Sequence, residues 1–212
     1  MLCRMLPIKM MLREQLRLAI REMEELNEVR EEAIRNSRRW ISIARNSILE
    51  SREFRNLRNV EKTLLESLRD VREFIGELKS KPGFSELAAS VVQDAVQELV
   101  EGIVLCKIVM GEEVPNHIEL GVGAREYLLG VSDVVGELRR IALHYLKEGN
   151  VRGAEELVEI MEEIYEGINS AVFPDSLIPL RRKVDEARIM IEKTISEIIF
   201  VKSSRRDGID GR

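Results

Sequence analysis

Two closely spaced pairs of carboxylates are the residues of this sequence best suited to chemistry. Glu98 and Glu101 are three residues apart, and Asp133 and Glu137 are four apart. On an α-helix, residues at either spacing are neighbours on the surface, so each pair would place two like charges side by side. Hard cations such as Mg²⁺ prefer carboxylate oxygens. Two such pairs on facing helices could therefore hold one or two metal ions.

The surrounding residues predict that both pairs lie on helices and border apolar faces. At roughly 100° per residue, the segment 85–110 has a broad apolar arc that leaves the first pair outside it. The segment 124–147 has an apolar arc opposite a narrow polar stripe. This stripe consists of Glu126, Asp133, Glu137, Arg140 and His144. Gly130 borders the stripe, where the lack of a side chain would let another backbone or a ligand approach closely. A metal ion held there could activate water and stabilise charge on a phosphodiester.

A simpler interpretation is that these carboxylates are ordinary surface charges. Charged residues make up 33% of the chain, so acidic pairs on helix surfaces are expected by chance. Glu137 with Arg140 could be an exposed ion pair that contributes little to stability. A di-iron bundle is a further alternative, but it requires Glu-x-x-His on its helices. Neither histidine follows a glutamate by three residues, which disfavours a di-iron site.

The rest of the sequence predicts a bundle of helices that would position these residues. The 212 residues are 44% hydrophobic and only 4% aromatic, a composition typical of helices packed on helices. The predicted helices are residues 9–57, which could contain one break, then 60–78, 85–110, 124–147, 153–168 and 178–201. No alternating apolar pattern demands a strand. We predict an all-α bundle of six to seven helices, forming one domain over residues 1–202, with a disordered tail at 203–212.

A basic stripe on the first predicted helix is a second candidate functional feature. Arg38, Arg45 and Arg52 recur every seven residues and so stay near one face. Guanidinium groups suit phosphate oxygens, and His144 on the carboxylate stripe could also contact a substrate. An ordinary solvated face is the alternative, because glutamates are interspersed with the arginines. Trp40, in the same segment, is predicted to anchor packing rather than to stack on a base.

Composition narrows the class of protein. The net charge of −5, from 33 Lys+Arg and 38 Asp+Glu, is not that of a typical nucleic-acid binder, so any binding must come from local basic faces. Cys3 and Cys106 lie outside any zinc-binding spacing, which favours a reducing, intracellular setting and incidental roles for both. No stretch approaches roughly 18 uninterrupted apolar residues. We therefore expect a soluble, cytoplasmic protein with no membrane partner.

Three segments resemble the translin–Trax family. Residues 127–140, YLLGVSDVVGELRR, are similar to the central motif of Trax chains, the catalytic partners in translin–Trax complexes. Residues 97–102, QELVEG, resemble the acidic helix of the same chains. Residues 174–198 resemble the last helix of the family. The resemblance extends over about residues 25–200 and implies a fold of seven α-helices.

The resemblance also implies an activity and a site. Family members assemble into hollow, octamer-like barrels with RNA inside, and Trax-type chains cleave RNA with Mg²⁺ held by four carboxylates. Carried over residue by residue, the metal-binding and catalytic positions are Glu98, Glu101, Asp133 and Glu137. Arg140 and Arg38 fall on positions associated with RNA contact, and we add Arg45 and His144 as expected RNA-binding residues. A hollow assembly would place these basic residues inside while the outer surface stays acidic.

We therefore expect a Mg²⁺-dependent endoribonuclease, with Mn²⁺ as an alternative ion. RNA is the expected partner, single-stranded DNA is a further candidate, and a homo-octamer is the expected assembly. The short chain suggests a prokaryotic-type member that acts without a separate translin partner. Translin-type chains lack the full set of carboxylates and bind without cutting, so a non-catalytic nucleic-acid-binding oligomer is the alternative. A helical scaffold with no nucleic-acid role is a third hypothesis.

Overall fold

The chain folds as a bundle of α-helices. The computed structural model describes residues 5–80 and 83–209. Within these ranges there are seven α-helices and no strand, which confirms the predicted all-α bundle. The helices are α1 (Met5–Arg52), α2 (Leu57–Glu77), α3 (Phe84–Met110), α4 (His117–Leu120), α5 (Ala124–Glu148), α6 (Val151–Asn169) and α7 (Leu180–Ile209), and the short 3-10 helix η2 (Leu78–Ser80) follows α2. No helix of the described part is long and apolar enough to cross a membrane.

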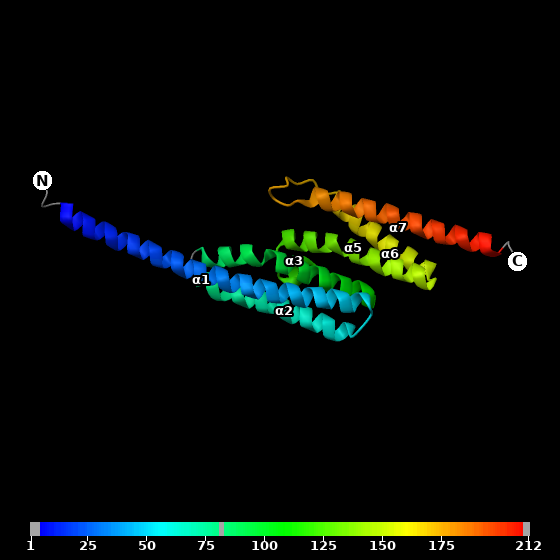
Figure 1. Ribbon diagram of the computed structural model, residues 1–212, viewed down its shortest axis with the longest axis horizontal. Coiled ribbons are helices and arrows are strands. Elements are labelled where there is room, and N and C mark those ends of the chain that lie inside the picture. The colour runs from blue at the N-terminus through cyan, green and yellow to red at the C-terminus, as the bar shows by residue number, and fades with distance from the viewer. Residues whose placement is uncertain (1–4, 81–82, 210–212) are drawn as a thin grey trace.

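Helix α3 is the centre of the bundle. It packs against α1 and α2 on one side and α5 on the other, and α6 and α7 pack onto α5 and onto each other (Figure 1). Because it has neighbours on several sides, α3 is apolar around most of its circumference. Leu99 and Ile103 of α3 are fully buried, as is Trp40 of α1. Trp40 packs against Phe74 of α2 with ring centroids 6.1 Å apart, which confirms its predicted packing role.

The turn between α1 and α2 departs from the prediction. Helix α1 ends at Arg52, whereas the sequence pattern predicted a helix to residue 57. The break occurs because Phe54 and Asn56 have left-handed backbones, with φ angles of 54° and 48°. Asparagine tolerates this region better than most residues. The Phe54 ring stacks on Tyr145 of α5, with centroids 5.8 Å apart and planes at 14°, so the turn is fixed by a tertiary contact.

Two other elements differ from the predicted boundaries. The one-turn helix α4 was not predicted; Asn116 caps it by accepting hydrogen bonds from the backbone of Ile118 and Glu119. Helix α7 runs to Ile209, so it continues through most of the segment expected to be a disordered tail, and the remaining residues 210–212 lie outside the described part. Cys3 also lies outside that part, and Cys106 is a buried, free thiol.

The close approach of α3 and α5 depends on Gly130. A methyl group added there would lie 2.7 Å from the Gln97 carbonyl oxygen and 2.9 Å from Val100 Cβ, both on α3. Those distances are too short for any side chain. Gly130 therefore allows the α5 backbone to contact the α3 backbone directly, as the sequence suggested. At Gly136, two turns along α5, the same methyl group would meet only Met190, at 3.7 Å.

We predict that Gly130→Ala destabilises the fold, because the added methyl group forces α3 and α5 apart. The expected loss is about 1–3 kcal/mol, as for other overpacked interiors, and it is measured by urea or thermal unfolding. Gly136→Ala is the matched control on the same helix. It should be neutral or stabilising by up to about 1 kcal/mol, because alanine favours the helix over glycine. Equal effects of the two substitutions would contradict this role of Gly130.

Candidate functional site

The two predicted carboxylate pairs come together where α3 runs beside α5. Glu98 and Glu101 lie on α3, and Asp133 and Glu137 lie on α5. Glu101 is the central member. Burial raises its pKa to about 8, and the negative charges of Asp133, Glu137 and Glu98 act in the same direction. The protein surroundings therefore disfavour the charged form of Glu101.

The other three carboxylates each face a basic side chain. Arg45 of α1 donates two hydrogen bonds to Glu98, at 2.9 and 2.7 Å. Lys183 of α7 forms an ion pair with Asp133, whose second oxygen accepts a hydrogen bond of 2.6 Å from Gln97. The cluster therefore draws its charges from α1, α3, α5 and α7.

Glu137 is the most enclosed of these carboxylates. It is 9% exposed and has Arg140 Nη1 3.2 Å from one oxygen and Arg52 Nε 3.2 Å from the other. The contact with Arg52 is too poorly aligned to be a hydrogen bond, so Arg52 Nε and Glu137 Oε2 are both buried without a hydrogen-bond partner. A buried polar atom without a partner is costly. Glu137 Oε2 is thus an electron-pair donor that the protein itself does not satisfy.

The chemistry of this donor set fits a hard divalent cation. Carboxylate oxygens are the ligands that Mg²⁺ prefers. The raised pKa of Glu101 and the unsatisfied oxygen of Glu137 are the two features that a cation would relieve. In the arrangement seen, with arginines and a lysine facing the carboxylates, no three acidic, histidine or cysteine side chains of the described residues converge on one point.

Two of the predicted RNA-binding residues touch this cluster, and the other two lie one or two turns away from them on the same helices. The side chains of Arg45 and Arg140 are 68% and 62% exposed, although each touches a carboxylate of the cluster. Arg38 is exposed on α1, two turns before Arg45. His144, one turn beyond Arg140, lies 3.3 Å from Glu148. Arg140 and His144 line a pocket of about 400 Å³ together with the end of α1.

The cluster contains three further residues that the site prediction did not include. Arg52 was visible as a member of the basic stripe, but nothing in the sequence linked it to Glu137. Lys183 and Gln97 lie within the segments 174–198 and 97–102 that resemble the translin–Trax family. No local spacing could have identified Lys183, because it reaches Asp133 across 50 positions of the chain.

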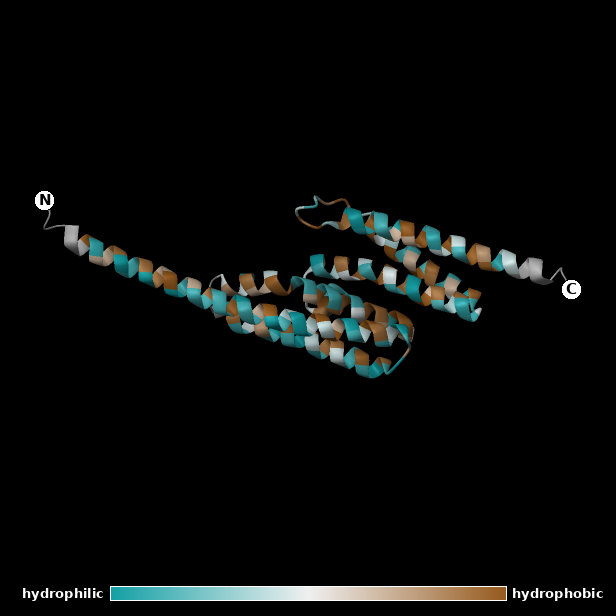
Figure 2. Cartoon of the chain, in the orientation of Figure 1, coloured by the Kyte–Doolittle hydropathy of each residue, from teal (hydrophilic) through white to brown (hydrophobic). Residues whose placement is uncertain are grey.

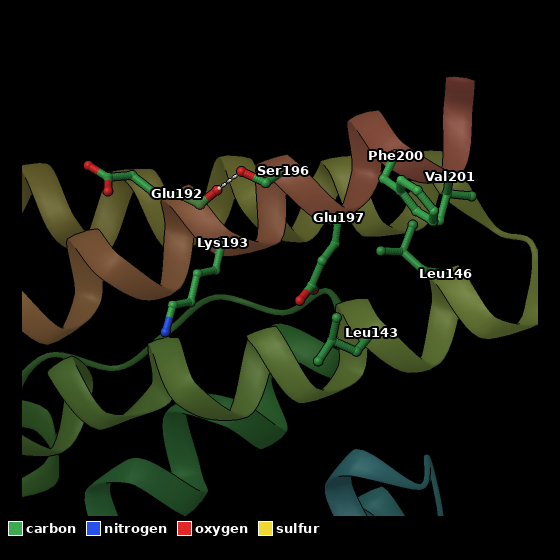
Figure 3. A pocket seen from close by; sticks show the side chains of 8 residues that line it. All are labelled: Leu143, Leu146, Glu192, Lys193, Ser196, Glu197, Phe200 and Val201. Carbon is green, nitrogen blue, oxygen red and sulfur yellow. Dashed lines mark hydrogen bonds between the residues drawn. The ribbon is translucent and has the colours of Figure 1, made fainter. Parts of the chain in front are cut away.

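A second pocket lies away from the carboxylates, between the C-terminal ends of α5 and α7. Its volume is about 630 Å³, and Leu143, Leu146 and Phe200 form much of its apolar wall (Figure 3). Glu197 in this wall accepts hydrogen bonds from Arg139, which also donates to Thr194. This network ties α5 to α7 and so supports the position of Lys183. None of the predicted site residues lines this pocket.

The family model for the Translin family matches residues 12–197. The chain belongs to the Translin family. An uncharacterised protein of Methanocaldococcus jannaschii is 33% identical over 135 residues, which is 63% of this chain and 60% of that relative. The matched region thus spans less than two thirds of the length of this relative. The family-model match confirms the resemblance seen in the three sequence segments.

Solved structures of the C3PO type share the fold. AfC3PO in complex with duplex RNA is similar with a TM-score of 0.75 and 35% identity, covering 90% of this chain and 98% of that one. A second structure of AfC3PO has a TM-score of 0.74 at the same identity and coverage. Apo-NeC3PO has a TM-score of 0.75 and 27% identity, covering 88% of this chain and 96% of that one.

The raised pKa of Glu101 predicts a pH-dependent stability difference. The carboxyl of Glu101 stays neutral in the folded protein up to about pH 8, whereas its ordinary pKa is 4.5. The folded state therefore loses stability relative to the unfolded state as pH rises from 4.5 to 8, and the loss stays constant above this range. Glu101→Gln, which stays neutral, should escape this loss.

Thermal unfolding of Glu101→Gln and the wild type in EDTA measures this difference. The two proteins should be similar near pH 4.5, and the variant should become more stable by up to a few kcal/mol at pH 9, because one pKa unit corresponds to about 1.4 kcal/mol. Glu163→Gln, at an exposed position of α6, is the control and should change little with pH. If the stability difference between Glu101→Gln and the wild type is the same at every pH, the pKa of Glu101 is not raised by its surroundings.

Proposed function

We propose that this protein is a Mg²⁺-dependent endoribonuclease that acts as a homo-oligomer. The observation that carries the proposal is that buried Glu101 lies near enough to Glu98, Asp133 and Glu137 for their charges, together with burial, to raise its pKa to about 8. A structural cluster without a ligand would gain nothing from this repulsion. Strongly perturbed acids of this kind concentrate at functional sites.

The proposed ligands of the ion are Glu98, Glu101, Asp133 and Glu137, with Mn²⁺ as an alternative to Mg²⁺. A divalent ion bound there would supply Lewis acidity and a more acidic water molecule for attack on a phosphodiester. Arg52 holds Glu137 from α1, and Lys183 with Gln97 holds Asp133. These three residues would orient two of the carboxylates that hold the ion.

The exposed arginines are suited to bind the RNA backbone beside this site. Arg45, Arg140 and Arg38 offer planar guanidinium forks that match phosphate oxygens, and His144 extends the same surface along α5. Contacts of this kind position a nucleic acid without selecting its sequence. AfC3PO, which shares the fold at 35% identity, has been solved with duplex RNA, which supports RNA as the partner here.

Assembly into a hollow homo-oligomer, with an octamer as the expected form, completes the proposal. The chain carries a net charge of −5, so RNA binding requires the basic residues to gather on one surface. A closed assembly would gather the arginines of several copies around an interior. Single-stranded DNA has the same backbone phosphates and is a further candidate ligand.

A second candidate function is nucleic-acid binding without cleavage. The observation that favours it is that Glu98, Asp133 and Glu137 each already face a basic side chain, and that no three acidic groups of the described residues converge on one point. In that case the arginines act alone, and the carboxylates only orient them. The two functions differ in whether the protein cleaves RNA when a divalent metal ion is present.

Incubation of labelled short RNA with the protein in Mg²⁺, Mn²⁺ or EDTA tests the nuclease proposal. Cleavage should require a divalent ion. It should fall by at least about a hundredfold in Glu137→Gln, which keeps the shape of the side chain but removes its negative charge. Glu163→Gln is the control and should cleave normally. Cleavage that persists in EDTA rejects the metal mechanism, and RNA binding without cleavage in both ions favours the second function.

The salt dependence of RNA binding tests the basic surface, whichever function holds. In EDTA, log Kd should rise linearly with log salt concentration, and Arg140→Ala should reduce the slope by about one, because one phosphate contact is lost. Arg152→Ala on α6, where the side chain is 89% exposed, is the control and should leave the slope unchanged. Equal slopes for the wild type and both variants would remove Arg140 from the binding surface.

A further inference from the structure

A cavity of about 400 Å³ opens beside the carboxylate cluster, at the turn between α1 and α2. It adjoins the cluster because Arg52 and Arg140, which both contact Glu137, also line the cavity. The other lining residues are Leu49, Glu53, Phe54, Ile141 and His144. Hydrophobic residues lie among hydrophilic ones where α1 passes into α2 (Figure 2). Phosphate contact by the arginines leaves the apolar part of this cavity without a role.

Phe54 forms an exposed aromatic wall of this cavity. It is 42% exposed, although its ring stacks on Tyr145 with the two planes at 14°. Phe54 also lines a second cavity of about 620 Å³, between the start of α2 and the end of α3. It therefore stands between two open spaces. Tyr145 supports part of the ring, and the rest is accessible to a ligand.

The backbone of Phe54 is held in a strained conformation. Its φ angle of 54° lies in the left-handed region, where a bulky residue is rare. Asn56, in the same turn, also has a left-handed backbone, but asparagine tolerates this region. Residues held in such costly conformations concentrate at ligand-binding sites. The turn thus presents an aromatic ring where a glycine or an asparagine would be less strained.

We propose that this cavity binds an unpaired nucleobase of the RNA, stacked on Phe54; this inference rests on the proposed function, in which RNA is the substrate. Proteins bind unpaired bases by stacking them on aromatic rings and by hydrogen bonds to their edges. Phe54 and Leu49 supply exposed apolar surface. Arg140, His144 and Glu53 supply polar groups beside it. Because bases within a duplex are already stacked and paired, the cavity selects RNA with an unpaired nucleotide beside the phosphate that Arg140 contacts.

RNA-binding measurements in EDTA, where no metal-dependent cleavage occurs, test this subsite. The probes are a single-stranded oligoadenylate, a ribose–phosphate oligomer of the same length without bases, and a fully paired duplex. The wild type should bind the oligoadenylate more tightly than the abasic oligomer. Phe54→Leu should weaken oligoadenylate binding by about tenfold, because stacking on an aromatic ring is lost. Its binding of the other two probes should be unchanged, as should the salt slope, since no phosphate contact is lost.

Two variants control for effects on the fold. Phe54→Tyr keeps an aromatic ring and should bind oligoadenylate as the wild type does. Phe200→Leu, at an exposed ring of α7 away from the carboxylates (Figure 3), should also leave binding unchanged.

The outcomes separate this subsite from the proposed function. Equal wild-type affinity for the oligoadenylate and the abasic oligomer overturns the subsite. So does a Phe54→Leu variant that binds the oligoadenylate as the wild type does, or one that loses affinity equally for both oligomers. In each of these cases the wild type still binds RNA, so the proposed function stands. Absence of RNA binding by the wild type rejects both.

Discussion

Repulsion among the carboxylates around Glu101 is the constraint on which the rest of the site depends. Four acidic groups are held together by two packed helices, and the surroundings offset their charges only in part. Arg45, Arg52 and Lys183 reduce the repulsion at the edges of the cluster, while Glu101 at its centre responds by holding its proton to about pH 8. This repulsion destabilises the folded state, so burial of apolar side chains elsewhere in the bundle must offset it.

That burial is concentrated around α3, and it explains why the cluster stays closed. A helix with apolar neighbours on several sides cannot move away from α5 without exposing Leu99, Ile103 and their contacts. Gly130 then sets the separation of α3 and α5 at the level of their backbones. Like charges at such a contact would separate two surface helices in isolation. Here the hydrophobic packing on both sides of α3 holds them in place.

The sequence was sufficient to predict the helices and the carboxylate pairs, because both are local patterns. Periodicity located the apolar arcs of α3 and α5. The two carboxylate pairs lay outside those arcs, and the structure brings the pairs close together. The partners of the carboxylates were not predictable in the same way. Lys183 meets Asp133 only through the packing of α7 on α5, and the end of α1 at Arg52 depends on Phe54 stacking on Tyr145.

The contact between Lys183 and Asp133 has a consequence for the order in which the protein can become functional during synthesis. As the ribosome produces the chain, α3 and α5 emerge well before α7, so a nascent bundle already contains all four acids but not the lysine. A bundle without α7 would leave Asp133 with Gln97 as its hydrogen-bond donor and without the cation of Lys183. The fourth source of charge in the site arrives with α7, so Asp133 gains its cation only when that helix packs on α5.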